Sequence, residues 1–346
     1  MKKIAIMTAG GDCAGLNAAI KSVVMAASKN NIVVVGIIDG FIGFVERKYM
    51  VLDNKIVENI ERQGGTILGS SNKECPFHYP SKEKKDEYED RVDAMIIIGG
   101  DGTLDSARVI DEAGMPTIGI PKTIDNDMVA SNPTIGFDTG VENAVEAIRK
   151  LKTTAASHRR VMVVEMMGRT SGYLTLYSGF AAGADIILLP ERDYDLNIVF
   201  NRVKEIMSTD KRYVIIAVSE ACKEKGKKET ISKVIKDSFE QKRFGGIAAK
   251  LSAQIEEITG YESRPMVLGH LQRGGDPCAS DIILGSRLGD YAFNLLSDGR
   301  HGYIVGVNQN EIQKMPFPRE RKPRLLDLEN DDIYRTAKDT GICFGI

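Results

Sequence analysis

Short apolar runs rich in β-branched residues recur along the chain, each bounded by glycine and followed by a helix-like pattern. Six such runs span residues 4–8, 33–38, 94–98, 117–120, 161–166 and 213–218. Strands that alternate with helices form parallel sheets with both faces covered, so each strand reads as a continuous apolar segment. The pattern therefore predicts an α/β fold built on mainly parallel sheets.

The length of 346 residues suggests two lobes, because a single hydrophobic core rarely grows this large. Each lobe is expected to hold a mainly parallel sheet covered by helices. Small ligands usually bind where two lobes meet, so we expect the active site in the cleft between them.

Composition argues against several classes of protein. The formal charge is only −2, so a broad basic surface for nucleic acid is not expected. The five cysteines are scattered and form no C-x-x-C pair, which argues against a disulfide framework or a zinc ribbon. The sequence shows no charged-then-apolar leader and no apolar stretch long enough to span a membrane. We expect a cytoplasmic protein with no membrane or nucleic-acid partner.

Two predicted strand-to-helix turns are rich in glycine. Gly99–Thr103 follows one apolar run and Gly10–Gly15 follows another. Backbone N–H groups at such a turn, together with the positive end of the helix, suit a phosphate, and two turns at one sheet edge suggest a polyphosphate. Asp101 is placed to hold Mg²⁺ through its carboxylate. A plainer alternative is a tight turn in which Asp101 caps the helix.

The segment Pro121–Asp127 follows a further apolar run and combines an ammonium, a hydroxyl and carboxylates. Phosphoryl transfer needs a carboxylate that accepts or orients the hydroxyl proton, and it needs cations that offset the charge of the phosphates. Lys122, Thr123 and Asp125 offer these groups. Asp-Asn-Asp is also a common turn composition, so a purely structural turn stays open at this point.

Arginines gather beside strand ends in the second half of the chain. Arg160 precedes one apolar run and Arg169 follows it, while Arg264 and Gly269–Gly275 flank another segment. The planar guanidinium binds phosphate oxygens in pairs. A single arginine is more often part of a surface ion pair, and it is their common position that indicates an anion site.

Taken together and in this order, these segments resemble the phosphofructokinase A family over nearly the whole chain. The resemblance implies a large nucleotide-binding lobe of about residues 1–136 and 272–322, and a smaller sugar-phosphate-binding lobe of about residues 137–271 and 323–346. It also implies the glycolytic 6-phosphofructokinase reaction, in which Mg²⁺-dependent transfer from ATP phosphorylates the 1-hydroxyl of fructose 6-phosphate.

The resemblance assigns roles residue by residue. Asp125 would be the general base, with Thr123 and Arg169 also catalytic, and Asp101 would hold Mg²⁺. Nucleotide-binding residues would be Gly11, Asn72, Lys73, Gly100, Asp101, Gly102 and Thr103. Substrate-binding residues would be Thr123, Ile124, Asp125, Arg160, Met167, Gly168, Arg169, Glu220, Arg264, His270, Leu271, Gln272 and Arg273. Because the arginines matching Arg160 and Arg264 reach into a neighbouring subunit's site in the family, a homodimer or homotetramer is implied.

Two positions bear on the phosphoryl donor. Lys122 is typical of pyrophosphate-dependent relatives and of a mixed branch that uses ATP. Gly102 favours ATP, because pyrophosphate users generally carry an aspartate there that would crowd and repel the α-phosphate. Asn72 and Lys73 stand where the familiar bacterial enzyme places an arginine against the donor's phosphates. We expect ATP, with a pyrophosphate-dependent fructose 6-phosphate 1-phosphotransferase as the alternative and a non-catalytic sensor of sugar phosphate and nucleotide as a third interpretation.

Overall fold

The computed structural model describes residues 1–71, 92–228, 230–234, 242–320 and 322–346. These residues form two compact units, and the chain passes between the units several times. The first unit comprises Met1–Ile124, Met128–Thr139 and Arg273–Pro323, and the second comprises Asp125–Asp127, Gly140–Gln272 and Arg324–Ile346. The short segment Asp125–Asp127 packs with the second unit.

The first unit holds a seven-stranded sheet in the order β13-β12-β5-β4-β1-β2-β3. The five strands from β12 to β2 run parallel, and the two edge strands β3 and β13 are antiparallel to their neighbours. The strands are β1 (Lys3–Thr8), β2 (Val33–Ile37), β3 (Tyr49–Leu52), β4 (Ala94–Gly99), β5 (Thr117–Pro121), β12 (Tyr303–Asn308) and β13 (Glu311–Pro316).

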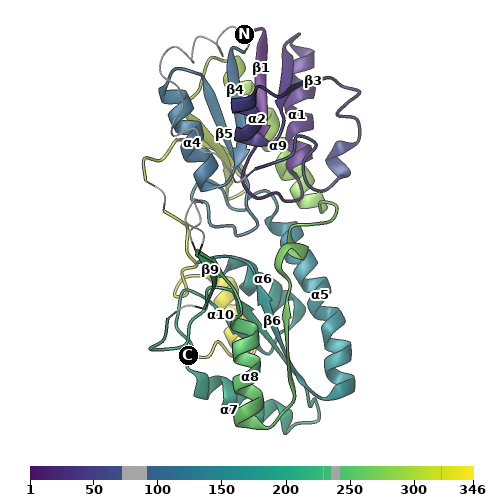
Figure 1. Cartoon of the computed structure of the whole chain (residues 1–346), viewed down its shortest axis with the longest axis vertical. Coiled ribbons are helices and arrows are strands. Elements are labelled where there is room, and N and C mark those ends of the chain that lie inside the picture. The colour runs from purple at the N-terminus through teal and green to yellow at the C-terminus, as the bar shows by residue number, and fades with distance from the viewer. Residues whose placement is uncertain (72–91, 229, 235–241, 321) are drawn as a thin grey trace. The chain divides into compact units, whose positions relative to one another are not determined.

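Helices pack on this sheet (Figure 1) and bury its central strands. They are α1 (Leu16–Lys29), α2 (Gly40–Glu46), α4 (Asp101–Glu112), α9 (Ala279–Ser297) and the short η1 (Ile60–Arg62), and α5 (Phe137–His158) begins here. α1 and α9 approach closely because Gly285 and Gly289 leave no side chain between the two helices: a Cβ at either position would overlap the α1 backbone or that of Gly15 just before it. This packing fixes the N-terminal end of α1.

The second unit holds a four-stranded parallel sheet in the order β11-β6-β8-β7. Its strands are β6 (Val161–Met166), β7 (Ile186–Leu188), β8 (Val214–Ser219) and β11 (Ser263–Val267). The remaining elements are α6 (Tyr173–Ala182), α7 (Leu196–Met207), α8 (Ile247–Thr259), η3 (Gly269–Gln272), α10 (Asp332–Asp339) and the hairpin β9 (Ile231–Val234) with β10 (Lys242–Phe244), besides most of α5. An aliphatic and aromatic core between the sheet and the helices α7 and α8 includes Val163, Phe200 and Leu251.

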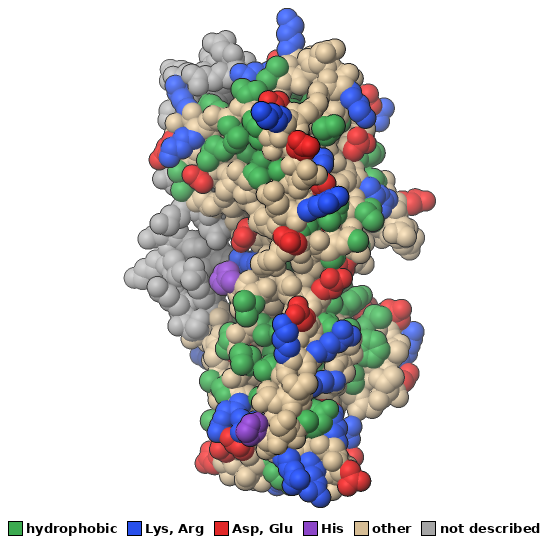
Figure 2. Space-filling view, turned by 90° about the vertical axis from the view of Figure 1, so that its right-hand side faces the viewer, with side chains coloured by type: hydrophobic (Ala, Val, Ile, Leu, Met, Phe, Trp, Pro, Cys, Tyr) green, Lys and Arg blue, Asp and Glu red, His purple; other side chains and the backbone are tan. Residues whose placement is uncertain are grey.

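The predicted fold class is confirmed: both units are mainly parallel sheets covered by helices (Figure 1). Every one of the six predicted strands is present, as β1, β2, β4, β5, β6 and β8. Within the part of the chain that the structure describes, no helix combines the length and the apolar character needed to cross a bilayer. On the face shown in Figure 2, acidic and basic side chains are interspersed.

Candidate active site

Three strands of the first unit end at the same sheet edge. The parallel register pairs Thr8 with Ile98, and Gly99 with Pro121, so the turns after β1, β4 and β5 lie side by side. Backbone hydrogen bonds continue the pairing past the strand ends, from Ala9 N to Ile98 O at 3.0 Å and from Lys122 N to Gly99 O at 3.0 Å. The carboxyl edge of a parallel sheet is the usual ligand position in α/β folds.

The turn after β4 leads directly into α4. Gly100 is the N-cap, Asp101 is the first residue of the helix, and Leu104 N donates to Gly100 O at 2.9 Å. The N–H groups of the first turn therefore point out of the helix end, where they and the helix dipole favour an anion. Asp101 and Gly102 are partly exposed, whereas Thr103 is buried and packs against Gly99.

The turn after β1 uses glycine for two physical reasons. Gly10 and Gly15 have φ of 84° and 95°, in the left-handed region that glycine adopts without strain. Gly11 is needed for space, because a Cβ there would lie 2.7 Å from Nη1 of Arg273. The structure thus places the guanidinium of Arg273, predicted to bind the sugar phosphate, against Gly11, predicted to bind the nucleotide.

Lys122 connects these turns. Its side chain is only 4% exposed, and its ammonium donates to the carbonyl oxygen of Gly11. The lysine predicted to bear on donor choice is therefore also part of the structure that holds the turn after β1.

The same turn contains Cys13, which is fully buried. Burial raises the pKa of this thiol to about 12, so the group is uncharged and inert.

The segment after β5 forms a buried turn. Thr123 N donates to Ile135 O at 3.2 Å, and Thr134 Oγ1 donates to Thr123 O at 2.7 Å. Asp125 is 6% exposed, and Asn126 has a φ of 53°, which asparagine tolerates better than most residues. Ile124 is buried at 3% exposure.

In the second unit, hydrogen bonds join the loop after β6 to the end of β8 and to η3, which follows β11. Met167 N donates to Gln272 Oε1 at 2.9 Å, and Arg169 N donates to Glu220 Oε1 at 3.1 Å. Gly168 has a φ of 137° and Arg169 a φ of 52°, so the chain turns sharply here and leaves the Arg169 side chain exposed. Five predicted residues, Met167, Gly168, Arg169, Glu220 and Gln272, are brought together in this way.

The rest of the predicted segment after β11 is more open. Gln272 is buried at 1% exposure, while His270 is exposed and Leu271 is 74% exposed. Leu271 therefore makes little contact within the unit. Asn72 and Lys73, predicted to contact the nucleotide, lie outside the described residues.

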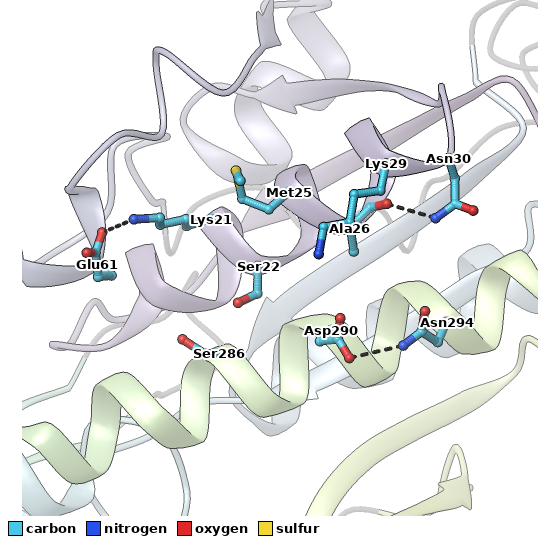
Figure 3. A pocket seen from close by; sticks show the side chains of 10 residues that line it. All are labelled: Lys21, Ser22, Met25, Ala26, Lys29, Asn30, Glu61, Ser286, Asp290 and Asn294. Atoms are coloured by element: carbon cyan, nitrogen blue, oxygen red, sulfur yellow. Dashed lines mark hydrogen bonds and ion pairs between the residues drawn. The ribbon is translucent and has the colours of Figure 1, made fainter.

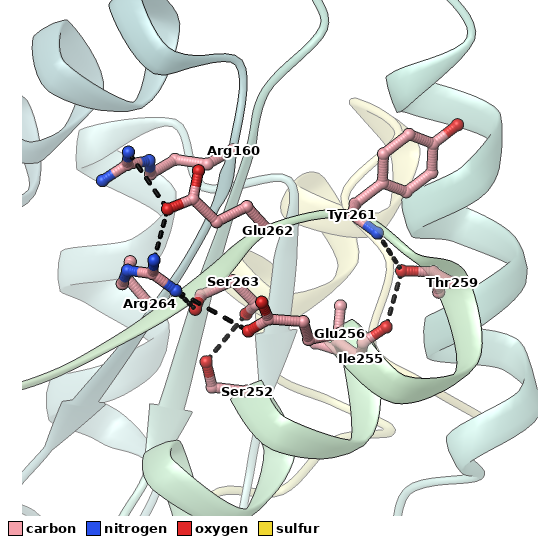
Figure 4. Close-up of polar contacts among 9 residues, drawn as sticks. All are labelled: Arg160, Ser252, Ile255, Glu256, Thr259, Tyr261, Glu262, Ser263 and Arg264. Carbon is pink, nitrogen blue, oxygen red and sulfur yellow. Dashed lines mark hydrogen bonds and ion pairs between the residues drawn. The ribbon is translucent and has the colours of Figure 1, made fainter.

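Arg160 and Arg264 meet at one carboxylate (Figure 4). Arg160 Nη2 lies 3.2 Å from Glu262 Oε1, and Arg264 Nη2 binds the same oxygen. Arg264 Nη1 also lies 3.6 Å from Glu256 Oε2 and donates to Ser263 O at 2.9 Å. β11 is the edge strand of its sheet, and its residues from Arg264 to Val267 are exposed. The structure thus places both arginines, predicted to serve a neighbouring subunit, beside an exposed edge.

A pocket of about 440 Å³ lies between α1 and α9 (Figure 3), and none of the predicted site residues lines it. Its charged groups are largely paired within the lining. Lys21 Nζ donates to Glu61 Oε2 at 2.7 Å, and Asp290 accepts from Asn294 Nδ2 at 3.0 Å. The pocket is therefore separate from the three converging turns that form the candidate site.

Comparison with known proteins identifies the family of this chain. The phosphofructokinase family model matches residues 3–296. An ATP-dependent 6-phosphofructokinase 2 of Clostridium perfringens is 41% identical over 99% of this chain and 98% of its own, and a pyrophosphate–fructose 6-phosphate 1-phosphotransferase of Dictyoglomus thermophilum is 40% identical over 90% of each. The phosphofructokinase structure from Saccharomyces cerevisiae matches with a TM-score of 0.79 at 26% identity, over 92% of this chain and 45% of the longer yeast chain. This chain belongs to the phosphofructokinase family.

Proposed function

We propose that the protein is an ATP-dependent 6-phosphofructokinase of the cytoplasm, which phosphorylates the 1-hydroxyl of fructose 6-phosphate in glycolysis. The proposal rests mainly on the convergence of three strand ends, β1, β4 and β5, which are followed by two glycine-rich turns and by the segment that contains Asp125. The similarity to the C. perfringens enzyme over nearly the full length supports the same activity.

The nucleotide would be held by the first unit. Gly11, Gly100, Gly102 and Thr103 would line its phosphates with backbone N–H groups and one hydroxyl, and Asn72 with Lys73 would add further contacts. Fixed donors of this kind stabilise the charge that spreads over the transferred phosphoryl group.

Mg²⁺ fits Asp101. Among the described residues there is no cluster of three or more potential metal-ligating side chains, so a cage made only of protein is not expected there. A single partly exposed carboxylate next to a phosphate cradle matches the usual protein site for Mg²⁺, in which phosphate oxygens and water complete the coordination. The ion would neutralise phosphate charge during transfer.

The acceptor would be held mainly by the second unit. Met167, Gly168 and Glu220 would bind the sugar phosphate, Glu220 through its hydroxyls. The cationic side chains Arg169, His270 and Arg273 would bind the 6-phosphate, with contacts from Leu271 and Gln272. Arg169 would stabilise charge on the moving phosphoryl group. Asp125 would take the proton of the 1-hydroxyl, with Thr123 and Ile124 beside it in the turn. A positioned base typically contributes about 10²- to 10⁴-fold to the rate.

A second copy of the chain would complete the site. Arg160 and Arg264 lie beside the exposed edge strand β11, where Met266 is 41% and Val267 56% exposed. An exposed apolar strand edge with two arginines beside it suits an interface between subunits. There the arginines would contact the sugar phosphate bound in the partner's site. We propose a homodimer or homotetramer in which these arginines bind the neighbouring subunit's sugar phosphate.

The second candidate is a pyrophosphate-dependent phosphotransferase, which Lys122 and the Dictyoglomus relative favour. Initial rates of fructose 1,6-bisphosphate formation, measured with Mg²⁺ and either ATP or pyrophosphate, separate the two. We expect a kcat/KM at least about tenfold higher with ATP, because Gly102 leaves room for the α-phosphate. A preference for pyrophosphate would establish the alternative, and binding of both substrates without any product would indicate the sensor.

A further inference from the structure

Three consecutive backbone carbonyls at the proposed catalytic base are each bound by a donor of the second unit. Ser171 Oγ donates to Asp125 O at 3.4 Å, and Arg324 Nη2 donates to Asn126 O at 2.6 Å. The backbone N–H of Arg324 donates to Asp127 O at 2.6 Å. Two of the three donors thus come from Arg324, which follows the base by 199 positions and belongs to none of the recognised motifs.

The turn needs such support. Asn126 is in the left-handed region with a φ of 53°, which asparagine tolerates better than most residues but which still costs free energy that contacts with its surroundings offset. The direction of the Asp125 side chain depends on the backbone of this turn. Loss of a hydrogen bond to the Asn126 carbonyl would therefore let the turn relax and move the carboxylate.

Arg324 is itself fixed from two sides. Its guanidinium carbon lies 4.5 Å from the centre of the Tyr173 ring, and the Tyr173 hydroxyl donates to Leu325 O at 3.3 Å. Burial lowers the pKa of Arg324, and the aromatic face and the Asn126 carbonyl compensate part of the lost hydration.

Glu191 extends the same connection to the proposed sugar-phosphate loop. Its Oε1 accepts from Leu326 N at 3.1 Å and from Gly172 N at 2.7 Å. Gly172 follows Arg169 by three residues. The segment Arg324–Leu326 is therefore hydrogen-bonded to the turn that carries the base and, through Glu191, to the loop that carries Arg169.

We infer that Arg324 is a positioning residue: it holds the turn of Asp125–Asp127 so that the Asp125 carboxylate meets the acceptor hydroxyl, without contacting either substrate. This inference rests on the proposed function, because it assigns Arg324 a task for the same base. It predicts that Arg324 affects kcat and leaves substrate affinity unchanged.

The test compares Arg324→Met with Arg319→Met, an identical substitution at an exposed arginine five positions earlier. Arg324→Met should lower kcat about 10- to 100-fold, the usual effect of a small misplacement, with KM for fructose 6-phosphate changed less than about twofold. Arg319→Met should match the wild type. An unchanged kcat, or a rise in KM alone, would overturn the inference.

A double variant separates positioning from a general structural effect. If Arg324 acts only through the base, adding Arg324→Met to Asp125→Ser should lower the residual kcat no further. A second loss as large as in the wild-type background would contradict the inference. Should Arg324→Met fold poorly, Arg324→Lys, which retains the cation over Tyr173 but not the planar fork, should show a smaller loss in kcat with the same unchanged KM.

A readout without turnover keeps this inference distinct from the proposed function. Amide hydrogen exchange of residues 123–128, followed by mass spectrometry, should be faster in Arg324→Met than in wild type or Arg319→Met. Unchanged exchange would overturn the positioning role whatever the enzyme's activity. A wild-type protein without phosphofructokinase activity would overturn the proposed function alone, and faster exchange would still locate the support of the turn at Arg324.

Discussion

A carboxylate suits general-base work when it is held in one orientation and screened from bulk water. Asp125 meets these conditions: it is 6% exposed, and its turn is bound at three successive carbonyls. Lys122, on the same segment, is also held in one position, because its buried ammonium donates to Gly11 O. At the residue scale, the proposed chemistry depends on groups whose positions are fixed before any substrate binds.

Asp125→Ser tests the base. It should reduce kcat by about 10²- to 10⁴-fold, because the acceptor hydroxyl loses its proton acceptor, while KM for fructose 6-phosphate changes far less. Steady-state kinetics with ATP measure both constants. Asp298→Ser, the same change at an exposed aspartate, serves as the control and should behave as the wild type. A rise in KM with an unchanged kcat would assign Asp125 to binding.

Gly102→Asp tests the basis of donor choice. Gly102 lies in the first turn of α4 and is not among the residues with positive φ, so its backbone can accept a side chain. The new carboxylate should lower kcat/KM for ATP by at least about tenfold through repulsion of the α-phosphate. The kcat/KM for pyrophosphate should fall much less, because pyrophosphate has no nucleoside-linked α-phosphate to be repelled. Equal losses with the two donors would refute the proposed role of Gly102.

At the scale of elements, hydrogen bonds between α9 and the start of α5 stabilise the first unit. Asp281 is fully buried and accepts from Gly136 N at 2.7 Å, Thr139 N at 2.8 Å and Thr139 Oγ1 at 2.6 Å. A carboxylate at a helix N-terminus satisfies N–H groups that the helix itself leaves unpaired. Because Ile135 also pairs with Thr123, this contact supports the turn that precedes the base.

Asp281→Ala should therefore destabilise the protein by roughly 1 to 3 kcal/mol, since buried donors lose their acceptor. Asp281→Asn, which keeps one acceptor oxygen, should lose less. The measurement is urea-induced unfolding, with the exposed Glu320→Ala as a control expected within about 0.5 kcal/mol of wild type. Unfolding of Asp281→Ala at the wild-type urea concentration would show that these hydrogen bonds contribute little.

The same scale shows what sequence patterns could predict. β4 is found because Ala94–Gly99 is a continuous apolar run, and every residue of it is buried. β3 and β13 are antiparallel edge strands with exposed residues, and β7 has only three residues, so none carries that pattern. Arg324 and Glu262 could not be identified in advance, because their importance comes from contacts with distant segments and not from any local motif.

At the scale of the whole molecule, the proposed site requires more than one chain. Arg160 and Arg264 share Glu262 beside an exposed strand edge, and in the proposed assembly they serve the neighbouring subunit. In a closed symmetric dimer each subunit would both give and receive this pair. Activity should therefore depend on residues from two copies at each site.

Hybrid assemblies test this arrangement. At fructose 6-phosphate concentrations well below KM, Asp125→Ser and Arg264→Ala subunits should each have little activity alone, the first because it lacks the base and the second because it lacks a phosphate contact. In a hybrid dimer, the subunit with intact Asp125 receives intact Arg264 from its partner, so random mixing of equal amounts should restore about one quarter of wild-type activity. Denaturation and refolding of the two variants together, followed by the kinase assay, measures it. Activity no higher than the mean of the two separate variants would show that Arg264 serves its own chain.

The central claim is that a magnesium polyphosphate held at Asp101 and a sugar hydroxyl facing Asp125 share one site. A crystal structure with Mg²⁺, a non-hydrolysable ATP analogue and fructose 6-phosphate tests it directly. We expect Asp101 to bind the metal at about 2.0–2.1 Å and the Asp125 carboxylate to lie roughly 2.6–3.2 Å from the 1-hydroxyl oxygen. Two acids that face separate ligands, too far apart to act on one pair of substrates, would contradict the claim.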